Sequence, residues 1–152
     1  MDLPEGLEAL EIRGGMFDKQ PLPAKLPDTI KKISFGLKCN QPVHGVRWPS
    51  SLRQLNFRHC FDQSVDMEEG PSLPMSLRTV HVGENFQKSL SRVWWPDDLE
   101  KISLSSSFSE SLREINLPRG LRRQTIAGNH AGQLDAVTWP PNISTIHSAR
   151  RV

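Results

Sequence analysis

The sequence predicts a mainly β solenoid of about six to seven 22-residue turns, with one short parallel strand in each turn and few or no long helices. Two observations predict this fold class. Prolines recur at nearly constant steps of 23, 22, 25, 22, 22 and 22 residues, at Pro4, Pro27, Pro49, Pro74, Pro96, Pro118 and Pro140. A proline in every turn also disfavours helices, because proline breaks the backbone hydrogen bonding of a helix interior.

Each turn is expected to contain one extended segment. In the turn that begins at Trp48, the apolar residues Leu52, Leu55 and Phe57 follow the spacing L-x-x-L-x-F. The last two are two positions apart, so their side chains point to the same side of an extended chain. We therefore expect a strand at 54–57 and at the equivalent positions of a single repeat domain, 1–152. Its turns begin near residues 3, 26, 48, 73, 95, 117 and 139.

Aligning the turns places residues at equivalent positions into columns, several of which have a shared character. The residues before the prolines alternate in size from the second turn on, and we expect one buried column from Leu26, Trp48, Leu73, Trp95, Leu117 and Trp139. Cys39 falls in a column with Phe61, Phe86 and Phe108, and is expected to be a buried small hydrophobe. The polar residues that follow this column are Asp18, Asn40, Asp62, Gln87 and Ser109, before it ends at Ala131. Such side chains suit bends, where they can bond to unpaired backbone groups.

Two regions depart from the repeat. The segment 66–72 is acidic, ends in glycine, proline and serine, and lengthens one turn, so a protruding loop is expected there. The last two turns are expected to be the least regular. Gln124 falls in an apolar column, His130 takes a phenylalanine position, and Ser148 ends the last strand column.

Composition narrows the class of protein. Of the 152 residues, 36% are hydrophobic, which suffices for a solenoid because each turn needs only one inward face. The net charge of +2 is too small to indicate nucleic acid or an anionic membrane as a partner. No secretory signal or membrane-spanning run is visible, and two cysteines are too few for a disulfide framework. We therefore expect an intracellular, cytoplasmic protein.

The repeats resemble those of the FNIP repeat family, a branch of the leucine-rich-repeat solenoids. The match comprises Trp48-Pro49-Ser50-Ser51-Leu52, Leu55 and Phe57, together with Phe35-Gly36 and Asn40-Gln41-Pro42. It covers almost the whole chain. The resemblance implies a leucine-rich-repeat-like, right-handed, curved solenoid with short parallel strands on its inner face. It also implies a protein-binding role and no catalytic residues.

No catalytic or metal-binding motif stands out in the sequence. The five histidines form no H-x-x-x-H motif, and no P-loop, dinucleotide-binding turn or nucleophile elbow is present. His81 and His147 share an outward column but lie three turns apart, about 14 Å, which is too far for one metal ion. We expect a protein that is not an enzyme and has no cofactor.

One surface feature suggests a binding site. Lys31, Arg53 and Arg78 occupy one outward column on consecutive turns, and Lys32 lies beside them. Like charges about 5 Å apart repel by roughly 0.8 kcal/mol even in water, so a structure gains nothing from this arrangement. The column could be a solvated face with splayed side chains, a site for an acidic partner, or a nucleic-acid surface. The last is disfavoured because no aromatic residue interrupts it for base stacking.

These observations predict a non-enzymatic protein–protein interaction module. Its strand face would bind a protein partner with an acidic segment through Lys31, Lys32, Arg53 and Arg78. An alternative is the substrate-recognition part of a larger enzyme assembly, such as a ubiquitin ligase. A nucleic-acid-binding surface is the weakest alternative, and no membrane partner is expected. The sequence leaves the oligomeric state open.

Overall fold

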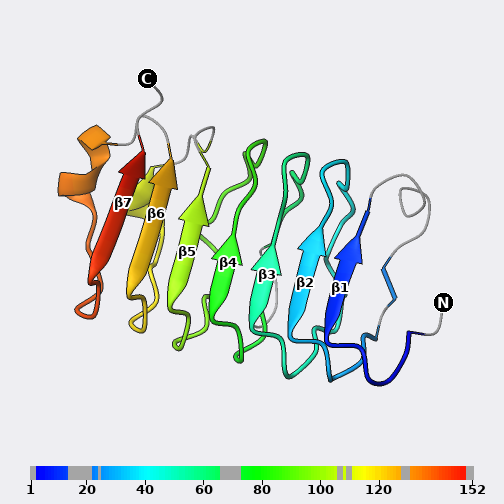
Figure 1. Cartoon of the computed structure of the whole chain (residues 1–152). Coiled ribbons are helices and arrows are strands. Elements are labelled where there is room, and N and C mark those ends of the chain that lie inside the picture. Colours follow the sequence, from blue (N-terminus) through cyan, green and yellow to red (C-terminus); the bar gives the residue numbers. More distant parts are fainter. Residues whose placement is uncertain are drawn as a thin grey trace.

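The chain folds into one sheet of seven parallel strands in sequence order, as a computed structural model shows (Figure 1). The structure describes residues 3–13, 22–23, 25–65, 73–105, 108, 111–127 and 131–149. The strands are β1 (Ala9–Ile12), β2 (Lys32–Phe35), β3 (Gln54–Asn56), β4 (Thr79–His81), β5 (Lys101–Leu104), β6 (Arg123–Ala127) and β7 (Thr145–Ala149). Five turns connect β2 to β7, whereas the connection from β1 to β2 lies largely outside the described residues. The turn count is thus slightly below the six to seven predicted.

The strand register confirms the alignment of the repeats. Leu55 of β3 pairs with Ile33 of β2 and with Val80 of β4. These residues are buried, as expected for the apolar strand column. Each strand is also preceded by the same corner, in which the proline carbonyl accepts a hydrogen bond from the amide three residues later, at 3.0–3.2 Å before all seven strands. The proline step therefore marks one physical feature, the corner that precedes each strand.

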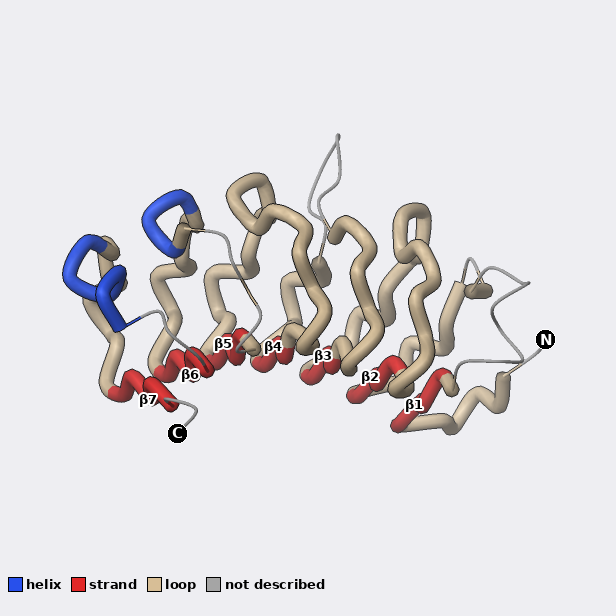
Figure 2. The backbone as a smooth tube through the Cα atoms, turned by 90° about the horizontal axis from the view of Figure 1, so that it is seen from above, coloured by secondary structure: helices blue, strands red, loops and turns tan. Residues whose placement is uncertain are grey.

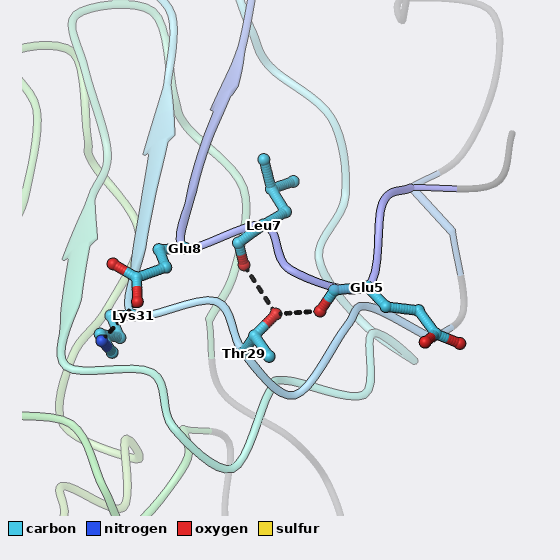
Figure 3. A network of polar contacts seen from close by, with 5 residues as sticks. All are labelled: Glu5, Leu7, Glu8, Thr29 and Lys31. Carbon is cyan, nitrogen blue, oxygen red and sulfur yellow. Dashed lines mark hydrogen bonds and ion pairs between the residues drawn. The ribbon is translucent and has the colours of Figure 1, made fainter.

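Side chains join neighbouring corners as well. The Thr29 hydroxyl lies 2.7 Å from the carbonyl oxygen of Glu5 and 2.8 Å from that of Leu7, both in the preceding turn (Figure 3). Ser76 donates in the same way to the carbonyl oxygen of Leu52, at 2.8 Å. Small hydroxyl residues after the proline thus satisfy backbone groups that the corner leaves unpaired.

Phenylalanines fill the interior on the far side of the strands. Phe61, Phe86 and Phe108 are buried, with ring centroids 6.3 and 6.4 Å apart along the stack. Phe57 lies 4.2 Å from Phe61 and is stacked on it. Cys39 occupies the same column and is fully buried, which confirms its prediction as a small hydrophobe.

The polar column performs the predicted backbone role where it is described. The Asn40 side-chain oxygen accepts from the Asp62 amide at 2.9 Å and from the Gln63 side chain at 3.0 Å. The Asp62 carboxylate in turn accepts from the Gln87 amide at 2.8 Å. The Asn40 and Asp62 side chains therefore each link their own turn to the next one.

The sheet forms an arc with the strands on its concave side (Figure 2). Two short 3-10 helices, η1 (Leu112–Glu114) and η2 (Ala131–Ala136), lie on the opposite, convex side (Figure 2). Among the described residues, no helix is long and apolar enough to cross a membrane. The prediction of few or no long helices is therefore confirmed for this part of the chain.

The column before the prolines is only partly as predicted. Leu26 and Leu73 are buried, whereas the remaining members are half-buried: Trp48, Trp95, Leu117 and Trp139. An indole is large and rarely becomes fully buried, and at this corner part of the ring stays in contact with water. The indole nitrogen of Trp139 donates to the carbonyl oxygen of Leu134 at 3.2 Å.

The predicted irregularities have mixed outcomes. Gln124 does occupy the core column and is 1% exposed, and its amide oxygen has no hydrogen-bond partner among the described residues. Ser148 lies exposed on β7. The predicted loop at 66–72 and His130 fall outside the described residues.

Candidate protein-binding face

The concave face is built from two adjacent outward columns of the sheet. One column precedes each strand and the other opens it, so both lie over the same edge of the sheet. From β2 to β6 the first holds Lys31, Arg53, Arg78, Glu100 and Arg122, and the second holds Lys32, Gln54, Thr79, Lys101 and Arg123. Seven of these ten residues are Lys or Arg and one is Glu, so this concave basic face is strongly positive in a chain of net charge +2.

The predicted basic residues do lie on consecutive turns. The Arg53 amide donates to the carbonyl oxygen of Lys31 at 2.8 Å, and the Arg78 amide donates to that of Arg53 at 2.9 Å. Lys32 pairs in register with Gln54. The structure therefore brings Lys31, Lys32, Arg53 and Arg78 together in the arrangement that the repeat step predicts.

Two of these four cations already have acidic partners. Lys31 Nζ lies 2.7 Å from a carboxylate oxygen of Glu8 in the preceding turn (Figure 3). Arg78 lies 2.8 Å from the Asp98 carboxylate and also donates to the Asp98 carbonyl oxygen at 2.9 Å. Arg78 lies in the predicted outward column but is only partly exposed, with a side chain that is 31% exposed. The acids come from neighbouring turns, outside the three turns considered in the sequence.

Lys32 and Arg53 remain available to a partner. Both are exposed, and neither forms an ion pair within the described part of the chain. Arg53 lies between Lys31 and Arg78 on the column, and both of these neighbours have a carboxylate beside them. These two residues form the available part of the predicted patch.

A second basic group lies farther along the same columns and was not singled out from the sequence. Thr79, Glu100, Lys101, Arg122 and Arg123 line a hollow of about 240 Å³ over β4 to β6. Lys101 and Arg123 are register partners on neighbouring strands. The sequence could have identified this second basic group, because both columns continue through these residues with the same 22-residue step.

The far ends of the strands carry a different group of side chains. His81, at the end of β4, helps to line a hollow of about 380 Å³ with Leu37, Arg58, His59, Gly83 and Glu84. Burial lowers the pKa of His81 below its ordinary value of about 6.5, and the nearby charges of Lys101 and Arg58 lower it further. His59 pairs with Glu84, its Nδ1 lying 3.0 Å from the carboxylate.

Within the described ranges, no three His, Cys, Asp or Glu side chains are grouped so that they could hold a metal ion. His81 and His147 do share an outward column, with β5 and β6 between their strands, as the sequence predicts. The arrangement offers charge and hydrogen-bond donors for a binding surface.

Comparison with known proteins identifies relatives in both sequence and fold. No protein-family model matches the chain. Over 105 residues, 68% of the chain, it is 33% identical to an FNIP repeat-containing protein of Dictyostelium discoideum. In fold it is similar to the crystal structure of CroV588, described as a circular leucine-rich-repeat protein, with a TM-score of 0.79 and 22% identity over 97% of the chain. The chain spans 20% of the first relative and 21% of the second.

Proposed function

Because the chain is an FNIP-type repeat solenoid with leucine-rich-repeat-like turns, we propose that it is a non-enzymatic protein-interaction module whose concave basic face binds an acidic segment of a partner protein. The observation that carries the proposal is the excess of seven basic residues over one acidic residue in the two columns from β2 to β6. The columns come from five strands and are assembled only by the fold. A surface of this kind suits an extended partner.

The chemistry of Arg53 and Lys32 supports an acidic partner. A carboxylate placed over Arg53 would supply the negative charge that Glu8 supplies to Lys31 and Asp98 supplies to Arg78. Arginine can bind a carboxylate through two parallel hydrogen bonds, which makes the contact directional as well as attractive. The two existing ion pairs therefore serve as internal examples of the contact that we propose for the partner.

The same surface is poorly suited to nucleic acid. Its two outward columns contain no Phe, Trp or Tyr on which a base could stack. Cys39 and Cys60 form no disulfide, which supports the expected intracellular, cytoplasmic location, since disulfides persist mainly in oxidising compartments. A cytoplasmic partner with an acidic segment is therefore the proposed ligand.

The test uses a fluorescein-labelled peptide of alternating glutamate and glycine, with a glutamine–glycine peptide and an oligothymidylate as comparisons. Fluorescence anisotropy would measure binding to the wild type and to the variant Lys32→Glu/Arg53→Glu. Both residues are exposed, so circular dichroism should show an unchanged fold. We expect the double charge reversal to weaken binding of the glutamate peptide at least about tenfold, which corresponds to about 1.4 kcal/mol.

A matched control separates a specific site from general attraction by charge. Arg92→Glu/Arg113→Glu makes the same change of net charge at two exposed residues, the second of which lies in η1 on the convex side (Figure 2). We expect this control to retain the affinity of the wild type within about twofold. Equal weakening by both variants, or tighter binding of the oligothymidylate than of the glutamate peptide, would contradict the proposal.

A further inference from the structure

We infer that the partner segment carries two acidic clusters about four residues apart, the first contacting Lys32 and Arg53 and the second entering the hollow over β4 to β6. This inference rests on the proposed function and specifies the partner's chemistry. Its starting observation is that the concave basic face contains two separate groups of cations without ion pairs. Lys32 and Arg53 form one, and Lys101, Arg122 and Arg123 form the other.

The second group is a shaped site as well as a charged surface. The hollow has a volume of about 240 Å³, and Lys101 in its lining is partly buried. Lys101 and Arg123 lie directly opposite each other on neighbouring strands. Their mutual repulsion would be relieved by an anion placed between them. None of the three cations forms an ion pair within the described part of the chain.

Glu100 helps to define which anion fits. It lines the same hollow, and the Arg122 amide donates to its carbonyl oxygen at 2.9 Å. With three cations and this one carboxylate, the lining carries a net charge of +2. Two carboxylates would balance that charge, and the proposed protein partner supplies them as aspartate or glutamate side chains. We therefore assign the site to acidic side chains of a protein.

The β4 turn lies between the two groups, and its two residues on the concave basic face are not available to bind a further anion. Arg78 is already held by the carboxylate and the carbonyl oxygen of Asp98. Thr79 is neutral and is the residue of β4 that faces the hollow. The partner segment is therefore expected to have uncharged residues where it crosses β4.

The spacing of the clusters follows from the geometry of the sheet. The first group is centred between β2 and β3, and the second between β5 and β6, three strand steps farther along. At about 4.8 Å per step the centres lie about 14 Å apart, and an extended chain covers that distance in about four residues. A segment with the pattern Glu-Glu-x-x-Glu-Glu, crossing the strands, meets this requirement.

The test compares labelled peptides of one composition, GEEGGEEG and GGEEEEGG, by fluorescence anisotropy on the full chain. The spaced peptide can occupy both groups at once, so we expect it to bind at least about tenfold more tightly than the contiguous peptide. Arg122→Glu/Arg123→Glu should remove this preference. The neutral variant Arg122→Gln/Arg123→Gln should reduce it, which checks the result with a milder substitution at the same exposed positions.

The outcomes separate this inference from the proposed function. If Lys32→Glu/Arg53→Glu weakens binding while both variants at Arg122 and Arg123 leave it unchanged, the second anchor is wrong and the proposed function stands. If the spaced and contiguous peptides bind equally to the wild type, the spacing is wrong. If none of the variants on the concave basic face changes binding, both the two-anchor inference and the proposed function are wrong. Loss of the preference for the spaced peptide in both Lys32→Glu/Arg53→Glu and Arg122→Glu/Arg123→Glu would support the two-anchor arrangement.

Discussion

Replacing Gly83 with alanine would place a methyl group in space that the neighbouring turn already occupies. An alanine Cβ at this position would lie 2.1 Å from the Arg58 carbonyl oxygen, 2.5 Å from its carbon and 2.7 Å from the Phe57 carbonyl oxygen. All three atoms belong to the backbone, so no side-chain rotation can relieve the contact. The turns that carry Gly83 and Arg58 must move apart.

The expected cost follows from the bonds that such a movement disturbs. The Phe57 amide donates to the His81 carbonyl oxygen at 2.8 Å, and the Asn85 amide donates to the His59 carbonyl oxygen at 3.0 Å, so both bonds join the two turns. Each such bond contributes about 1 kcal/mol net, and overpacking adds about 1–3 kcal/mol. We therefore expect Gly83→Ala to lower the free energy of unfolding by about 3 kcal/mol.

Urea unfolding followed by tryptophan fluorescence would measure this loss. Gly6→Ala is the matched control, because an alanine Cβ there would have no atom within 4 Å. The control should change the free energy of unfolding by less than about 1 kcal/mol in either direction. A loss below about 1 kcal/mol for Gly83→Ala, or an equal loss for both variants, would refute the close approach of the two turns.

Three further perturbations test other parts of the structure. Trp95→Ala should cost about 2–3 kcal/mol in urea unfolding, less than the 3–5 kcal/mol of a fully buried aromatic, because its indole is half-buried; a loss above 4 kcal/mol would contradict that. Asn40→Ala should cost about 1–2 kcal/mol by the same assay through the loss of its bonds to Asp62 and Gln63, whereas Asn40→Asp, which keeps the acceptor, should cost less. The pKa of His81 is lowered in the folded state, so the contribution of His81 to stability is present above about pH 6.5 and is lost as the pH falls through the folded pKa. Urea unfolding curves of His81→Asn, measured at several pH values, should lack this part of the pH dependence.

Most of the fold could be predicted from the sequence because one local feature repeats at a constant step. Every proline corner has the same hydrogen bond, and the 22-residue step then fixes the register of strands such as β2 and β3. The half-burial of Trp48 and Trp95 could not be predicted in this way. A repeat alignment identifies which residues share a column, but the space at a corner depends on how the turns pack.

The candidate site was only partly predictable for a related reason. The columns placed Lys31, Arg53 and Arg78 on neighbouring turns, which the backbone bonds confirm. They did not reveal that Asp98, which lies within the proline corner before β5, pairs with Arg78. Side chains of this length reach across columns, so ion pairs depend on rotamers that residue spacing does not specify.

The central claim is that an acidic partner segment lies across the concave basic face, and amide chemical-shift mapping would test it most directly. The ¹⁵N-labelled chain would be titrated with the peptide GEEGGEEG at low salt. We predict that the largest shift changes occur at Lys32, Arg53 and Arg123, with little change in η1 on the convex side. Changes centred instead on Trp94, whose side chain is exposed away from these columns, or absent from the concave strands altogether, would contradict the claim.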